Sequence, residues 1–194
     1  MQNENSPQKN LNSHAHVGKR RILLSATILL LIFIVLGILA YSPAATTVSS
    51  PSPLLGKTAP NFGGVGIVGG KDLTLSQYRG KFVVLNFFAS WCNPCFQESP
   101  ALVSFAYEHH SDNIVKILGV VFSDSSKNAA NFLKSVGATW NAINDTTGSI
   151  AIRYGVSEPP ETFLISPTGI ILVKFIGPVT LNGLNSAIKR YQSS

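Results

Sequence analysis

Cysteine is scarce in this chain, which has only Cys92 and Cys95 among its 194 residues. A zinc site usually has four protein ligands or three with a water, and a single Cys-x-x-Cys supplies two. The nearest histidines, His109 and His110, do not stand at a metal-ligand spacing from the cysteines, and no histidine follows them. The sequence therefore predicts no metal site.

Charge is also scarce, because charged residues make up 12% of the chain and the formal net charge is +6. Lys9, Lys19, Arg20 and Arg21, opposed by Glu4, already contribute half of that net charge. The other charges are dispersed, whereas a nucleic-acid groove requires basic residues that cluster. We therefore expect no nucleic-acid partner, and we ascribe the N-terminal charge to membrane topology.

One long apolar run, ILLSATILLLIFIVLGILAY at residues 22–41, contains no charged residue. About twenty residues form roughly 30 Å of helix, which is enough to cross the core of a bilayer. The Lys/Arg cluster before it predicts that residues 1–21 stay in the cytoplasm and that the rest lies outside it. A cleaved signal peptide is the alternative, with Ser42-Pro43-Ala44 as its cleavage site. Signal peptides usually have apolar cores of about 7–15 residues, so we favour an uncleaved transmembrane anchor.

Small, hydroxylated and proline residues fill residues 42–53, SPAATTVSSPSP, and indicate an extended linker. The remaining residues, 54–194, are enough for one domain with a sizeable core. We thus expect a single-pass cell-membrane protein whose N-terminus is cytoplasmic. Its domain would lie in a periplasm or on the outer face of the cell.

Apolar patterns within the domain alternate between strand and helix. FVVLNFF at residues 82–88 is a near-continuous run of strand formers and predicts a strand that is buried on both faces. Further along, Leu102, Phe105, Ala106 and His109 recur at the spacing of one helix face. A helix is therefore expected directly after this strand.

The rest of the domain continues the alternation. Its last two strands flank Ser166-Pro167-Thr168-Gly169, which fits a type I turn and predicts a β-hairpin. Early parallel crossovers followed by a late antiparallel pair predict an α/β fold, a mixed central β-sheet with helices on both faces. The other expected elements are strands at 114–122, 141–144, 161–165 and 170–176, and helices at 126–136, 147–153 and from Thr180 to about Tyr191.

The two cysteines stand where the strand at 82–88 gives way to the next helix. Pro94 fits the first turn of that helix, where its missing N–H costs nothing. The sulfur of Cys92 is then expected to face unpaired backbone N–H groups and the positive end of the helix dipole, both of which favour a thiolate. We predict Cys92 as the attacking thiol and Cys95, about one turn further into the helix, as the resolving thiol.

Three other interpretations of the cysteines compete with this one. A structural disulfide is possible outside the cytoplasm, but so short a loop constrains the unfolded chain weakly. Zinc lacks two ligands, and two buried free thiols do not suit an exposed helix start. Cys-x-x-Cys at a strand-to-helix turn is a known reactive arrangement, so we favour redox chemistry.

The sequence WCNPC after FVVLNFFAS, with Pro100 in the following helix, resembles the redox centre of the thioredoxin fold. The apolar run, the linker and GVSEPPETFLISPTGIIL are similar to membrane-anchored thioredoxin-like proteins of the TlpA, ResA and CcmG (DsbE) type. The resemblance covers about residues 55–192. It implies a thioredoxin-like fold, preceded by one transmembrane helix, with a redox-active Cys92–Cys95 disulfide and no other cofactor.

The resemblance also implies roles for residues outside the WCNPC sequence. Pro160 aligns with the cis-proline that lies against the disulfide, and we expect the Pro159–Pro160 bond to be the cis one. Glu98 and, more weakly, Glu161 align with acids near the thiols, where Glu98 would either tune the pKa values of the thiols or move a proton to the leaving thiolate. A helix glutamate is otherwise usually solvated.

Asn86 departs from the cytoplasmic thioredoxins, which have a proton-transferring aspartate at this position. An asparagine cannot titrate, so its presence places more weight on Glu98. Trp91 is expected to pack beside the disulfide, with a plain core tryptophan as the alternative.

The function that the resemblance implies is the reduction of disulfides in partner proteins, apocytochrome c among them, with electrons from a transmembrane thiol reductant. A disulfide-forming oxidase would use the same residues and differ in reduction potential. A peroxidase of the peroxiredoxin type normally has a Thr-x-x-Cys sequence, and a copper chaperone of the Sco type has Cys-x-x-x-Cys with a distant histidine. This chain has neither pattern.

Overall fold

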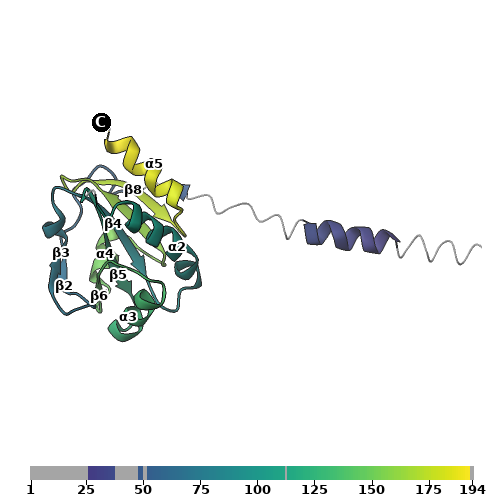
Figure 1. Ribbon diagram of the computed structural model, residues 1–194, viewed down its shortest axis with the longest axis horizontal. Coiled ribbons are helices and arrows are strands. Elements are labelled where there is room, and N and C mark those ends of the chain that lie inside the picture. The colour runs from purple at the N-terminus through teal and green to yellow at the C-terminus, as the bar shows by residue number, and fades with distance from the viewer. Residues whose placement is uncertain (1–25, 38–47, 50–51, 112, 193–194) are drawn as a thin grey trace, which may run out of the picture. The chain divides into compact units, whose positions relative to one another are not determined.

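Two units, Met1–Ala44 and Ala45–Ser194, make up the chain in this computed structural model (Figure 1). The structure describes residues 26–37, 48–49, 52–111 and 113–192. In the first unit, residues 26–37 form a helix with exposed side chains. Among the described residues, no helix has both the length and the apolarity needed to cross a membrane. The expected anchor at 22–41 extends at both ends beyond the described helix.

The second unit is built on a six-stranded mixed sheet in the order β1-β8-β7-β4-β5-β6. Its central strand β4 pairs with β5 in parallel and with β7 antiparallel, and the hairpin of β7 and β8 is antiparallel. A mixed central sheet was the sequence-based prediction, and it is confirmed. The strands are β1 (Val48–Ser49), β4 (Phe82–Phe88), β5 (Val115–Phe122), β6 (Ala142–Asp145), β7 (Glu161–Ile165) and β8 (Ile171–Ile176).

A small hairpin and a short helix lie between β1 and β4 in the chain. The hairpin consists of β2 (Gly63–Val65) and β3 (Asp72–Thr74), and the 3-10 helix η1 (Leu75–Tyr78) follows it. The sequence did not predict these elements, because each spans three or four residues and β2 includes two glycines. Such short segments carry little hydrophobic periodicity.

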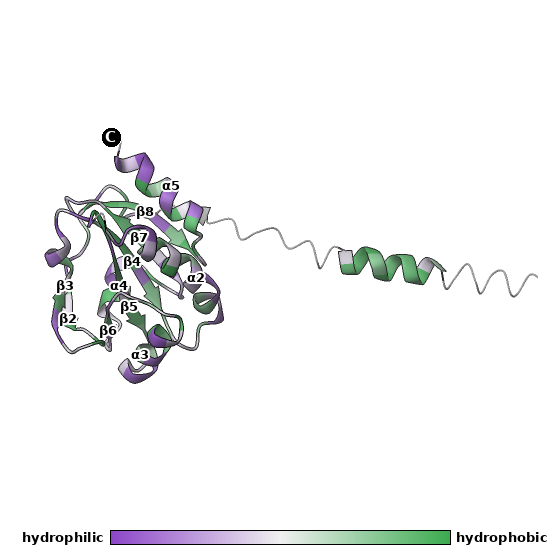
Figure 2. Cartoon of the chain, viewed as in Figure 1, coloured by the Kyte–Doolittle hydropathy of each residue, from purple (hydrophilic) through white to green (hydrophobic). Residues whose placement is uncertain are grey.

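Two hydrophobic clusters lie on opposite faces of the sheet, since successive side chains of a strand point to opposite faces. On β4, Leu85 and Phe87 belong to one cluster with Tyr154 of α4, and Val84 belongs to the other with residues of α2 and α5. In Figure 2 the central strands are coloured mainly as hydrophobic. The helices are α2 (Asn93–Glu108), α3 (Ser126–Ser135), α4 (Ser149–Tyr154) and α5 (Leu181–Gln192).

A third cluster brings α3 to the two cysteines. Phe88 at the end of β4 packs with Cys92, Cys95 and residues of α3. The sulfurs therefore sit at the carboxyl end of the central strand, in contact with the hydrophobic core. All seven residues of β4 are buried, so the core holds this strand in place. The strand in turn positions the cysteines that follow it.

Two features that the local sequence predicts, the turn between the last two strands and the cap of the last helix, are present. The amide of Gly169 donates to the carbonyl of Ser166 at 2.8 Å, which closes the turn between β7 and β8. Thr180 caps α5 by accepting a hydrogen bond from the amide of Gly183 at 3.1 Å. The predicted bounds of the main strands and helices agree with the observed ones to within one or two residues.

Candidate active site

Cys92 and Cys95 form a disulfide at the start of α2. Cys92 is the N-cap residue, Pro94 stands in the first turn, and the amide of Cys95 donates to the sulfur of Cys92 at 3.1 Å. Both cysteines are nearly inaccessible, with 3% of Cys92 and 1% of Cys95 exposed. Cys95, one turn further into the helix, is slightly the more buried of the two. The cap position leaves Sγ of Cys92 facing the positive end of the helix.

Pro159 and Pro160 form the wall opposite the disulfide. The bond between them is cis, as predicted, and both residues are buried. The carbonyl oxygen of Pro159 lies 3.5 Å from Sγ of Cys92, and the carbonyl of Pro160 accepts a hydrogen bond from Gly177 at 2.9 Å. The second contact holds this wall to the end of β8, while the first places an acceptor against the sulfur of Cys92.

Glu98 lies one turn after Cys95 on α2, and only 2% of it is exposed. Its carboxylate accepts hydrogen bonds from the side-chain amide of Asn86 at 2.8 Å and from the backbone amide of Val179 at 2.9 Å. Burial is the dominant influence and raises the pKa of Glu98 to about 7, although both hydrogen bonds act in the opposite direction. The interpretation of Glu98 as a solvated helix residue is wrong.

Asn86 holds that carboxylate from the central strand. Its two amide N–H groups are both used, one by Glu98 and the other by the hydroxyl of Thr162 at 2.9 Å. An aspartate at this position would offer oxygens where donors are needed, and it would place two carboxylates side by side. Asparagine is therefore the residue that fits a buried acid at Glu98.

Glu161 follows the cis-proline but belongs to a different buried network. Its carboxylate pairs with the ammonium of Lys174 at 2.6 Å and accepts a hydrogen bond from the amide of Ser157 at 3.2 Å. Lys174 also donates to the carbonyl of Gly155 at 2.9 Å. The network thus holds the segment that leads into Pro159. Among the described residues, no hydrogen bond joins Glu161 to a cysteine.

Sequence reasoning missed Lys174, although a signal was present. A lysine inside the apolar run IILVKFI is costly to bury unless an acid pairs with it. Hairpin pairing places Lys174 opposite Phe163, two residues from Glu161. A lone charge in a strand of this kind therefore predicts a buried partner on the neighbouring strand.

Trp91 lies on the rim of the site, and 57% of it is exposed, so its interpretation as a core tryptophan is wrong. Its indole N–H donates to the carbonyl of Ser123 at 3.1 Å. Nearby, the carboxylate of Asp124 accepts the amide of Ser90 at 2.8 Å. Burial alone would raise the pKa of Asp124, but its hydrogen bonds outweigh that effect and lower it. The loop after β5 therefore anchors the loop that carries the cysteines.

Exposed aromatic surface flanks the disulfide. Phe96 on α2 is 57% exposed, like Trp91, and its ring meets Phe132 edge-on at 6.3 Å. Aromatic side chains with one face in solvent are common anchors in protein interfaces. Within the described residues, no group of three His, Cys, Asp or Glu side chains is placed to hold a metal ion. The arrangement is suited to exchanging a disulfide with another protein.

Comparisons with known proteins agree with this geometry. Residues 55–174 match the family described as the AhpC/TSA family. The chain is 35% identical over 162 residues to the thiol-disulfide oxidoreductase ResA of Bacillus subtilis, covering 84% of this chain and 88% of ResA. It is 37% identical over 131 residues to a thiol:disulfide interchange protein DsbE homolog of Paracoccus denitrificans, covering 66% of this chain and 70% of the relative.

A solved structure gives the same result for the fold. A thiol:disulfide interchange protein DsbE from Chlorobium tepidum superposes with a TM-score of 0.64 at 28% identity, covering 70% of this chain and 96% of that one. Its fold is thioredoxin-like, as the sequence predicted for this chain. The chain therefore belongs to the AhpC/TSA family, and it is an enzyme of the thioredoxin-like thiol-disulfide oxidoreductases.

Proposed function

We propose that this enzyme is tethered to the membrane, faces away from the cytoplasm and reduces disulfides in partner proteins. The surroundings of Cys92 are the observation that supports disulfide exchange and its direction. A backbone amide and the start of a helix favour its thiolate, while the Pro159 carbonyl at 3.5 Å opposes it. An oxidant of the DsbA type owes its strength to a strongly stabilised reduced form. The Pro159 carbonyl acts in the direction of a reductant, against the amide and the helix start, and the reduction potential reports which effect prevails.

The exchange proceeds in two steps. The Cys92 thiolate attacks a partner disulfide, which forms a mixed disulfide and releases one partner thiolate that takes up a proton. Cys95 then gives up its proton, and its thiolate attacks Sγ of Cys92. The second partner thiolate leaves, so the partner is reduced and the Cys92–Cys95 bond is restored.

Glu98 serves the second step by taking the proton of Cys95, and it returns that proton when Cys95 leaves during re-reduction. Residues three apart on a helix are neighbours, which brings this carboxyl near the resolving sulfur. A pKa of about 7 suits a group that both accepts and donates a proton near neutral pH. Asn86 and Val179 position the carboxyl, and Glu161 positions the Pro159 wall.

The partners and the location follow from the resemblance and the N-terminal sequence. Apocytochrome c is the proposed client, and a transmembrane thiol reductant is the proposed electron donor. The uncharged run at 22–41 after Lys19, Arg20 and Arg21 supports a tether with a cytoplasmic N-terminus.

Replacement of the resolving thiol should trap the client. In a Cys95→Ser variant the first step still occurs, but the mixed disulfide persists because no second thiol attacks it. Nonreducing gels of whole cells should show the chain bound covalently to a partner, which mass spectrometry identifies. The matched Cys92→Ser variant should trap none. A Cys95→Ser variant that forms no covalent complex would contradict the proposed function.

The direction of electron flow can be read from the reduction potential of Cys92–Cys95. Equilibration with glutathione or dithiothreitol should give a value near the roughly −270 mV of thioredoxin, or lower. A value near the roughly −120 mV of DsbA would identify an oxidase and would remove the cytochrome proposal.

The ionisation of Glu98 should appear in the pH dependence of stability. Its pKa rises from 4.5 to about 7 on folding, so the native state binds a proton that the unfolded state releases. The free energy of unfolding should therefore fall as pH rises from about 4.5 to about 7, by up to about 3 kcal/mol from this group. Glu98→Gln should abolish that fall, measured by urea unfolding of the oxidised enzyme.

The same variant separates a proton-transfer role from a structural one. Glu98→Gln should slow partner reduction tenfold or more and should flatten its pH profile near neutrality, since general acid–base catalysis contributes about 10²–10⁴-fold. Glu108→Gln, an exposed acid at the far end of the same helix, is the matched control and should change neither property. An unaltered pH profile in Glu98→Gln would remove Glu98 from the mechanism.

The tether has its own test. Protease added outside spheroplasts should digest residues 54–194 and leave an N-terminal epitope protected, and a variant lacking residues 22–41 should lose membrane association. Full protection of the domain would place it in the cytoplasm and overturn the proposed location.

A further inference from the structure

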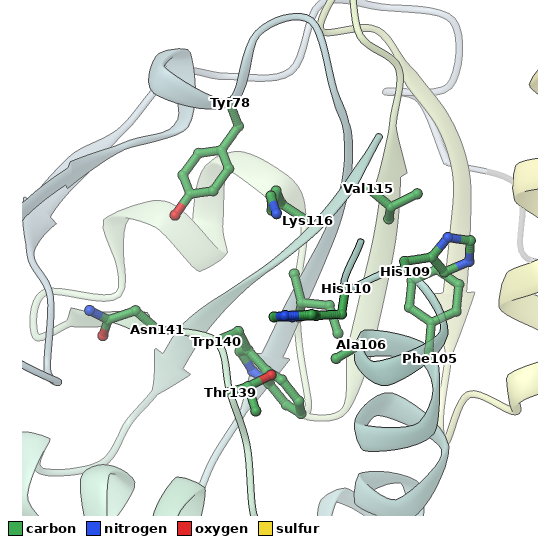
Figure 3. A pocket seen from close by; sticks show the side chains of 11 residues that line it. Tyr78, Phe105, Ala106, His109, His110, Val115, Lys116, Thr139, Trp140 and Asn141 are labelled. Atoms are coloured by element: carbon green, nitrogen blue, oxygen red, sulfur yellow. The ribbon is translucent and has the colours of Figure 1, made fainter. Parts of the chain in front are cut away.

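A hollow of about 400 Å³ lies at the opposite end of α2 from the disulfide. It is bordered by η1, the last turns of α2, the start of β5 and residues 139–141 before β6 (Figure 3). Cys95 and Phe105, a wall residue, are about 15 Å apart along the helix axis. The volume of the hollow falls within the roughly 300–1,000 Å³ of small-molecule sites. The proposed redox chemistry makes no use of the hollow.

The polar lining of the hollow supplies donors and lacks acids. Lys116 on β5 is partly buried, and His109 and His110 stand at the end of α2. No Asp or Glu is among the lining residues that the structure describes. In that same part of the chain, no hydrogen bond or ion pair engages the ammonium of Lys116, so its charge is uncompensated there.

Two further donors belong to the same walls. The indole N–H of Trp140 is buried and meets no acceptor among the described residues. Tyr78 reaches the hollow from η1, and burial raises the pKa of Tyr78, so its hydroxyl stays protonated. Buried donors in proteins nearly always have a partner, so the unmatched indole N–H of Trp140 on the wall of the hollow supports binding of an acceptor there.

The remaining walls are aromatic and aliphatic. The rings of Tyr78, Phe105 and Trp140 line the hollow, together with Val115 and Ile117. Figure 3 shows Tyr78, Lys116 and Trp140 entering from different elements, with His109 beside Phe105. The ring of His109 packs against Phe105 at 4.5 Å between ring centres, with the ring planes tilted by 52°, which makes His109 part of the wall. Ligand sites commonly combine apolar walls with a few polar groups in this way.

We propose that this hollow binds a small anion with a flat apolar body, such as an aromatic carboxylate, with Lys116 contacting the carboxylate and the aromatic walls contacting the ring. The cation and the donors require an acceptor of negative charge. The rings require an apolar body, which excludes a bare inorganic ion as the preferred ligand. The site is separate from the Cys92–Cys95 centre and does not depend on the proposed direction of electron flow.

The chain contains a reporter for this site, because Trp140 and Trp91 are its two tryptophans. In the full chain carrying Trp91→Phe, Trp140 is the single indole. Titration with 4-nitrobenzoate, a flat anion that quenches indole fluorescence, should quench Trp140 saturably. The neutral 4-nitrobenzamide has nearly the same shape, and it should bind at least about tenfold more weakly because it lacks the charge that Lys116 contacts.

Lysine variants in the same background test the contact. Lys116→Met should weaken binding of 4-nitrobenzoate about tenfold and leave 4-nitrobenzamide unchanged, since a hydrogen bond to a charged group is lost. Lys116→Arg keeps the charge and should retain most of the affinity, which also shows that position 116 tolerates replacement. Lys127→Met, on the exposed start of α3, is the matched control and should bind like the parent.

Three results would overturn the proposal. Quenching that rises linearly without saturation would indicate collisions in solution and no site. Equal affinity for the acid and the amide would remove the anion preference. Unchanged binding of 4-nitrobenzoate by Lys116→Met would show that the anion does not lie against Lys116.

Discussion

The buried carboxyl of Glu98 connects three parts of the domain that are far apart in the sequence. It belongs to α2, it is held by Asn86 of the central strand, and it accepts the amide of Val179 just before α5. Taking a carboxyl out of water is costly, and two good donors only partly offset that cost. Ionisation of Glu98 in this buried position therefore lowers the free energy of unfolding at neutral pH. The proposed exchange of a proton with the neighbouring thiols gives a reason for a buried acid at this position despite its cost.

The wall opposite the disulfide depends on a second buried network. Glu161 and Lys174 neutralise each other inside the protein, and between them they hold Ser157 and Gly155 through backbone hydrogen bonds. This segment leads to Pro159, whose carbonyl faces Cys92. The two acids near the redox centre therefore have different tasks. Burial raises the pKa of Glu98 to about 7, whereas Glu161 forms an ion pair with Lys174.

The sequence was informative wherever a signal is local. FVVLNFF predicts β4 because all its residues except Asn86 are apolar, and Pro94 with two cysteines marks the start of α2. The state of Glu98 was beyond such reasoning, since the amide of Val179 lies 81 positions away. The exposure of Trp91 was equally hidden, because its partner Ser123 comes from another loop. Contacts between distant segments decide burial, and burial decides which acid can carry a proton.

Pro100, in the middle of α2, has a consequence for how the helix can move. A proline lacks the N–H that would bond to the carbonyl of Phe96, so the ladder of backbone hydrogen bonds is interrupted there. Cys92, Cys95 and Glu98 all precede the interruption, and the walls of the distant hollow follow it. The helix is thus divided into a segment that carries the cysteines and a segment that borders the hollow, joined by fewer hydrogen bonds than an unbroken helix would have. The two ends of α2 are therefore coupled through the backbone less tightly than the ends of an unbroken helix.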